Sequence, residues 1–117
     1  MSKKKANPPE RFQTPSRNWH EPHIILFNRL LQSQSWHNLS HGARDLYILL
    51  LSQYKGVFTG NKVKCPYTDI INYGFGRANI SKYLKELELE GFIDIESGGF
   101  SRVANIYHFS DRWIDKQ

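Results

Sequence analysis

Cationic and acidic side chains are segregated along one stretch in the second half of the chain. The sequence "GFGRANISKYLKELELEGFI", residues 74–93, has Arg77, Lys82 and Lys85 toward its start and three glutamates toward its end. Helix electrostatics favour the opposite order, with acids near the N-terminus and cations near the C-terminus. The order found here suits a phosphate-bearing partner, because cations, backbone amides and the positive end of the helix would meet the same negative charge.

The helical period sorts this stretch into a side that faces the core and a side that faces outward. An arc of about 100° is apolar and is expected to face the core; it holds Ile80, Tyr83, Leu84 and Leu87. The opposite side, with its flanks, holds Ala78, Asn79, Ser81, Lys82, Lys85, Glu86 and Leu89.

The outward side offers the side-chain types that read base edges. Ala78 and Ser81 are small enough to allow close approach, Asn79 can pair bidentately with adenine, and Arg77 or Lys82 can reach guanine or a phosphate. The glutamates are expected to lie away from the duplex, where repulsion is weaker. The candidate DNA-binding residues of this helix are therefore Arg77, Ala78, Asn79, Ser81, Lys82 and Lys85. The alternative is a solvated helix face with an ordinary mix of charges.

A glycine-rich segment after this helix predicts a β-hairpin that supplies a second contact. "FIDIE" and "VANIYHF" alternate apolar and polar residues, which is the strand pattern, and "SGGFSR" joins them. Ser101 and Arg102 follow the two glycines at the expected tip. An arginine there can enter a minor groove or grip a backbone phosphate. The alternative is an exposed arginine in a turn.

The elements before the recognition stretch should position it. "HIIL", residues 23–26, is expected to be a short strand, and "FNRLLQSQSW" one or two helical turns. Ser40 is a good N-cap for an apolar helix to about Tyr54, which should lie at the centre of the core. "VKC" predicts a very short strand, and Pro66 suits the first turn of a helix to about Tyr73.

The remaining elements complete the expected fold. "YGFG" is a turn, the recognition helix runs over residues 77–90, and Gly91 suits its left-handed C-terminal position. Trp113 is expected to fold back onto the core. Two helices joined by a tight turn and followed by a hairpin predict an α+β winged helix-turn-helix, with a three-helix core and a C-terminal β-hairpin wing. This domain should span residues 23–117.

Residues 1–22 differ from the rest, with four of the five prolines and almost no aliphatic side chains. They are expected to form a flexible basic arm. Lys3, Lys4 and Lys5 are candidate DNA contacts, and the alternative is a solubilising terminus. The formal net charge of +5 indicates an anionic partner.

Other chemistry finds little support in the sequence. A single cysteine, Cys65, excludes an internal disulfide and fits a reducing compartment. No apolar run approaches the roughly 20 residues of a membrane span, so we expect a cytoplasmic protein. The histidines of "HEPH" lack further ligands at metal-binding spacing, and Asn79 stands where a dinucleotide fingerprint has its third glycine. We therefore expect no metal, no cofactor and no catalytic residues.

"GFGRANISKYLKELELEGFIDI" resembles the recognition-helix segment of bacterial and phage winged-helix DNA-binding proteins. "LSHGARDLYILLL" is similar to their first core helix, and "GGFSRVANIYHFSDRW" to their wing and returning strand. The resemblance covers residues 39–113. It implies double-stranded DNA binding through the residues named above, in transcriptional regulation or in the replication of a plasmid, prophage or other mobile element. Gly76 departs from the Ser or Thr cap of many relatives.

Two expectations about partners remain open. The sequence has no long terminal helix of the kind that dimerises many winged-helix repressors, so we expect a monomer or a weak dimer. The alternative to DNA binding is a protein-interaction module on the same fold, with Leu89, Phe100 and the tyrosines as its partner surface.

Overall fold

Helices and a small antiparallel sheet assemble into an α+β fold. The structure is a computed structural model that describes residues 23–54, 60–96 and 106–116. In these ranges the helices are α1 (Asn28–Leu31), α2 (Gln34–His37), α3 (His41–Ser52), α4 (Tyr67–Tyr73), α5 (Arg77–Leu89) and a 3-10 helix, η3 (Arg112–Lys116). The strands are β1 (Lys62–Lys64), β2 (Ile93–Glu96) and β3 (Ile106–Phe109). The predicted α+β class is confirmed.

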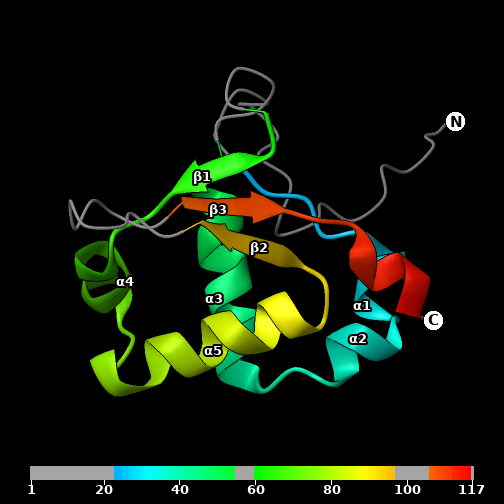
Figure 1. The fold of residues 1–117 in the computed structure, drawn as a ribbon, viewed down its shortest axis with the longest axis horizontal. Helices are drawn as coiled ribbons and strands as arrows, with labels where there is room; N and C mark the ends of the chain where they lie inside the picture. Colours follow the sequence, from blue (N-terminus) through cyan, green and yellow to red (C-terminus); the bar gives the residue numbers. More distant parts are fainter. Residues whose placement is uncertain (1–22, 55–59, 97–105, 117) are drawn as a thin grey trace, which may run out of the picture.

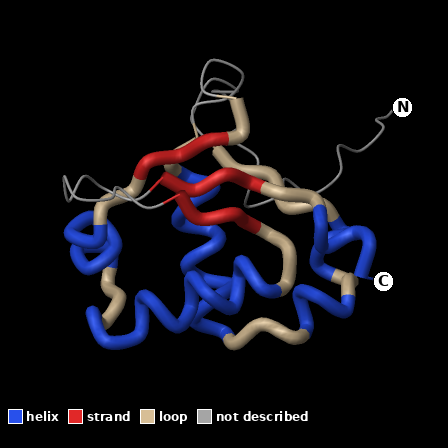
Figure 2. The backbone as a smooth tube through the Cα atoms, in the orientation of Figure 1, coloured by secondary structure: helices blue, strands red, loops and turns tan. Residues whose placement is uncertain are grey.

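The three strands form one antiparallel sheet in the order β1-β3-β2, so β3 is central (Figure 1). Val63 and Ile95 both lie opposite Tyr107, and these side chains are turned toward the core. Lys62, His108 and Asp94 form the next row on the opposite face, as the period of two requires. The helices of the described residues lie on one side of the sheet, and none of them covers its other face (Figure 2).

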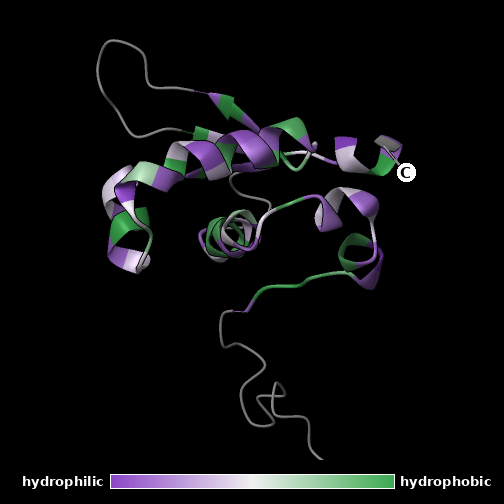
Figure 3. Ribbon diagram, turned by 90° about the horizontal axis from the view of Figure 1, so that it is seen from below, coloured by the Kyte–Doolittle hydropathy of each residue, from purple (hydrophilic) through white to green (hydrophobic). Residues whose placement is uncertain are grey.

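The core is organised around α3, which begins where the sequence predicts. The Ser40 hydroxyl accepts a hydrogen bond from the Ala43 amide at 3.2 Å and caps the helix. Buried side chains cover one broad side of α3; they are Ala43, Leu46, Tyr47, Leu49 and Leu50. Seen from below, α3 is viewed nearly end-on beside α5, whose hydrophilic and hydrophobic residues alternate along its length (Figure 3).

Aromatic rings close the end of the core where α5 joins the sheet. Phe92 is fully buried, and its ring stacks on Trp113 with centroids 5.7 Å apart. The same ring meets Trp36 edge-on at 5.8 Å and Tyr47 at 5.4 Å. The prediction that Trp113 folds back onto the core is therefore confirmed.

One predicted element is wrong, and the others differ at their ends. Residues 23–26 adopt no strand, because the segment pairs with none of the three strands of the sheet. Its side chains still alternate, with Ile25 exposed and Leu26 against the core. The helix predicted to reach Tyr54 ends at Ser52, whereas α1 and α2 are single turns as expected.

Gly91 sets the angle between α5 and the sheet. Its φ is +91°, in the region that favours glycine, and a Cβ there would lie 2.6 Å from the Trp113 backbone nitrogen. The Phe92 amide donates back to the Leu87 carbonyl at 2.9 Å, which closes the helix end. The chain can therefore turn directly from α5 into β2.

Candidate nucleic-acid interface

A tight turn presents the N-terminal end of α5 to solvent. Gly74 ends α4 with a φ of +128°, and the Phe75 amide donates to the Ile70 carbonyl. Gly76 is the N-cap of α5, and no side chain caps the helix. Phe75 and Ile80 are buried on either side of this turn, which fixes its position on the core.

The exposed side of α5 carries the side chains that the helical period predicts. Ile80, Leu84 and Leu87 are buried against the core, and Tyr83 is half-buried. The six candidates are all exposed; they are Arg77, Ala78, Asn79, Ser81, Lys82 and Lys85. The first turn of α5 contains no acidic residue, so positive charge and the positive end of the helix coincide.

The hairpin opens toward the same end of the molecule as this helix terminus. β2 ends at Glu96 and β3 begins at Ile106 above α4 and the start of α5, on the left of Figure 1. The predicted wing contacts Ser101 and Arg102 lie outside the described residues, as do the arm lysines Lys3, Lys4 and Lys5.

The two glutamates of α5 and Glu90, its C-cap, have a structural role that the sequence did not indicate. The Glu86 carboxylate accepts from the Ser40 amide at 2.8 Å and from its hydroxyl at 2.9 Å. Glu88 accepts from the Ile95 amide at 3.0 Å, and Glu90 from the Asn38 side chain at 3.3 Å. Glu86 is therefore half-buried instead of lying on the outward side as predicted. These bonds join the C-terminal half of α5 to α2, α3 and β2, and they hold the three carboxylates away from Arg77 at the start of the helix.

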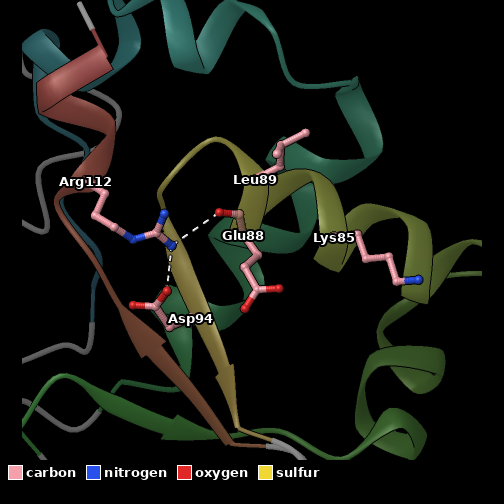
Figure 4. Close-up of a pocket in the computed structure, with 5 residues that line it drawn as sticks. All are labelled: Lys85, Glu88, Leu89, Asp94 and Arg112. Atoms are coloured by element: carbon pink, nitrogen blue, oxygen red, sulfur yellow. Dashed lines mark hydrogen bonds and ion pairs between the residues drawn. The ribbon is translucent and has the colours of Figure 1, made fainter.

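Arg112 completes the attachment of α5 to the sheet. Its guanidinium donates to the Glu88 carbonyl at 3.3 Å, the Ile93 carbonyl at 3.1 Å and the Asp94 carboxylate at 2.5 Å (Figure 4). Arg112 and Glu88 form hydrogen bonds with backbone groups of β2 that face away from β3. Since β2 is an edge strand of the sheet, these groups have no neighbouring strand within the described residues to pair with. An open hollow of about 560 Å³ lies beside this contact, with Leu89 at its rim.

Replacing Glu86 with alanine should lower the free energy of unfolding by about 2 kcal/mol, because two hydrogen bonds to a charged acceptor are lost. Urea unfolding followed by circular dichroism measures the loss. Glu86→Gln keeps an acceptor oxygen and should lose less. An alanine variant as stable as the native chain would mean that the Ser40 contact contributes nothing.

Two further kinds of residue are candidate sites in the part of the chain that the structure describes: groups that could hold a metal ion, and the cysteine. No three His, Cys, Asp or Glu residues within the described part are grouped to hold a metal ion. Burial, with a smaller contribution from Asp69, raises the pKa of the Cys65 thiol to about 11, so it is neutral at pH 7. Of the helices in the described ranges, none has the length and apolarity to cross a membrane. Comparisons with protein-family models, curated proteins and solved structures gave no match, so the candidate interface rests on the chain's own geometry.

Proposed function

We propose that this chain binds double-stranded DNA through the exposed side of α5, on a winged helix-turn-helix fold. The observation that carries the proposal is the difference between the two halves of α5. Its exposed side begins with Arg77, Asn79 and Lys82 at an uncapped N-terminus, whereas its glutamates are engaged in internal hydrogen bonds. Such a surface concentrates positive potential at one end of one helix.

The element order and the sheet order support the fold assignment. β1 lies between α3 and α4 in the chain, α4 and α5 are joined by a tight turn, and β2 and β3 follow as a hairpin. The three-helix core of the proposed fold would be α3, α4 and α5. The hairpin opening beside the start of α5 would let both elements reach one duplex (Figure 1).

In the proposed complex, α5 enters the major groove, which is wide enough to admit a helix. Asn79 would read adenine, Arg77 guanine or a phosphate, and Lys82 and Lys85 the backbone. Arg102 on the wing would contact the minor groove or a phosphate. The biological role would be transcriptional regulation or control of replication in a mobile element or phage.

Affinity for a duplex should fall steeply with salt if the electrostatic account is right. Neutralising about six phosphates predicts a slope of log K against log salt near −5. Fluorescence anisotropy of a labelled duplex, titrated at several salt concentrations, measures the slope. A flat response, or no binding at low salt, would remove the proposal.

The second candidate is a protein-interaction module on the same fold. The observation that favours it is Leu89, whose side chain is 72% exposed at the rim of the hollow in Figure 4. The double variant Lys82→Glu with Arg102→Glu separates the two functions. Normal duplex affinity in that folded variant would favour the protein partner, whereas its loss favours DNA.

A further inference from the structure

A stack of aromatic rings leads from the core to the surface beside the start of α5. The ring of Tyr83 meets Phe75 edge-on, with centroids 6.1 Å apart. Phe75 in turn stacks on Tyr73, with centroids 6.2 Å apart and planes inclined by 20°. Tyr73 ends the stack and is 55% exposed.

The inner end of this stack packs against α3. Tyr83 lies directly against Gly42 of α3, where a Cβ would overlap its ring. Phe75 is buried and follows Gly74, whose positive φ brings the ring back over Tyr73. The exposed Tyr73 ring is therefore supported by the buried Phe75 ring, which Tyr83 contacts in turn, and binding a ligand to it would cost little ordering entropy.

We propose that Tyr73 is a stacking platform for an unpaired DNA base at the border of the α5 interface. The inference rests on the proposed function, because it places the platform beside the DNA-binding side of α5. Arg77 is only four residues away, so its Cα lies within about 14 Å of that of Tyr73. A ring with a free surface beside cations is the combination that single-stranded nucleic acids require.

An unpaired base is the favoured ligand because an aromatic ring stacks on the face of a base, and that face is accessible only when the base is not stacked in a duplex. Bases in a duplex stack on one another and offer their faces to no side chain, whereas single strands and splayed bases offer both faces. The competing explanation is a phosphate contact by the Tyr73 hydroxyl, which any duplex would satisfy. The two explanations differ in whether the hydroxyl or the ring is needed.

The experiment uses a ten-nucleotide DNA single strand with 2-aminopurine at its centre, and the same strand annealed to its complement. Tyr73→Phe keeps the ring and removes the hydroxyl, whereas Tyr73→Leu keeps apolar volume and removes the ring. Native protein and Tyr73→Phe should quench the single-strand fluorescence equally. Tyr73→Leu should bind the single strand roughly 5-fold to 150-fold more weakly, the range for one stacked base, and should not quench.

Each result has a defined consequence. Equal single-strand affinity for Tyr73→Leu and native protein overturns the platform, as does a loss in Tyr73→Phe that matches the loss in Tyr73→Leu. Duplex affinity, measured in parallel, tests the proposed function separately. Native protein that binds the duplex but shows no Tyr73-dependent quenching keeps the proposed function and overturns the platform. Tyr73-dependent quenching without duplex binding overturns the proposed function and, with it, the placement of the platform at the border of a duplex interface. An RNA strand of the same sequence shows whether the platform prefers DNA.

Discussion

Replacing both Arg77 and Lys82 with glutamate should abolish measurable duplex binding at moderate salt while leaving the chain folded. Both side chains are exposed, and the contact recorded for the pair is that of the Lys82 amine above the Tyr83 ring, at 5.9 Å from its centroid. Loss of two such contacts predicts at least a roughly 30-fold drop in affinity. The charge reversal then adds repulsion of the phosphates.

The stability of the single variant Arg77→Glu distinguishes a functional cation from an incidental one. Arg77 occupies the first position of α5, next to the positive end of the helix, where a cation is unfavourable by about 0.3–1 kcal/mol. A glutamate there should raise the free energy of unfolding by a similar amount. We therefore expect Arg77→Glu to increase stability and decrease affinity, which is the signature of a residue retained for binding.

A matched control separates the α5 contacts from the overall charge. Lys62 and Lys64 are exposed, but they lie on β1 and not on the proposed interface of α5. Lys62→Glu with Lys64→Glu changes the net charge by the same four units as the α5 variant. Equal losses in the two double variants would show that only net charge matters, and an unchanged affinity in the α5 variant would refute the interface.

The double variant Arg77→Ala with Lys82→Ala tests the same two contacts through the salt dependence of duplex affinity. If each side chain neutralises one phosphate, the slope of log K against log salt should become shallower by about 2. Anisotropy titrations at matched salt concentrations measure both slopes.

The elements that follow from local chemistry were predictable from the sequence. Ser40 caps α3, and Gly91 ends α5, because hydroxyl capping and a positive φ are properties of single residues and their immediate neighbours. The segment at residues 23–26 was not predictable in the same way. Its apolar residues satisfy the strand pattern, but a strand needs a partner, and that depends on the whole sheet.

In the candidate site, too, features set by neighbouring residues were predictable, whereas features set by distant parts of the chain were not. Exposure of Arg77, Asn79 and Lys82 follows from the period of α5 and agrees with the prediction. The bonds of Glu86 to Ser40 span 46 residues of sequence, so no local pattern indicates them. Arg112 was missed for the same reason, since its acceptors belong to α5 and β2. Charge segregation along α5 therefore accompanies an internal attachment at its C-terminal half and the proposed interface at its start.

Replacing Phe92 with alanine should cause the largest loss of stability in the described part of the chain, about 3–5 kcal/mol. The ring is fully buried and contacts Trp36, Tyr47 and Trp113, which belong to α2, α3 and η3. Removal leaves a cavity where these elements meet, and three rigid rings cannot easily collapse into it. Thermal melting followed by circular dichroism should show a midpoint lower by about 10–20 °C.

The same substitution at an exposed phenylalanine provides the control. Phe27 is 65% exposed, so Phe27→Ala should change the free energy of unfolding by no more than about 0.5 kcal/mol. Equal losses at the two positions would mean that the aromatic cluster does not organise the core. Because Phe92 lies three residues beyond α5 and is fully buried, it is not part of the exposed side of that helix, and the folded fraction of Phe92→Ala should bind DNA normally. Duplex affinity should therefore decline with temperature in parallel with unfolding, in contrast to Arg77→Glu, where affinity is lost while the fold becomes more stable.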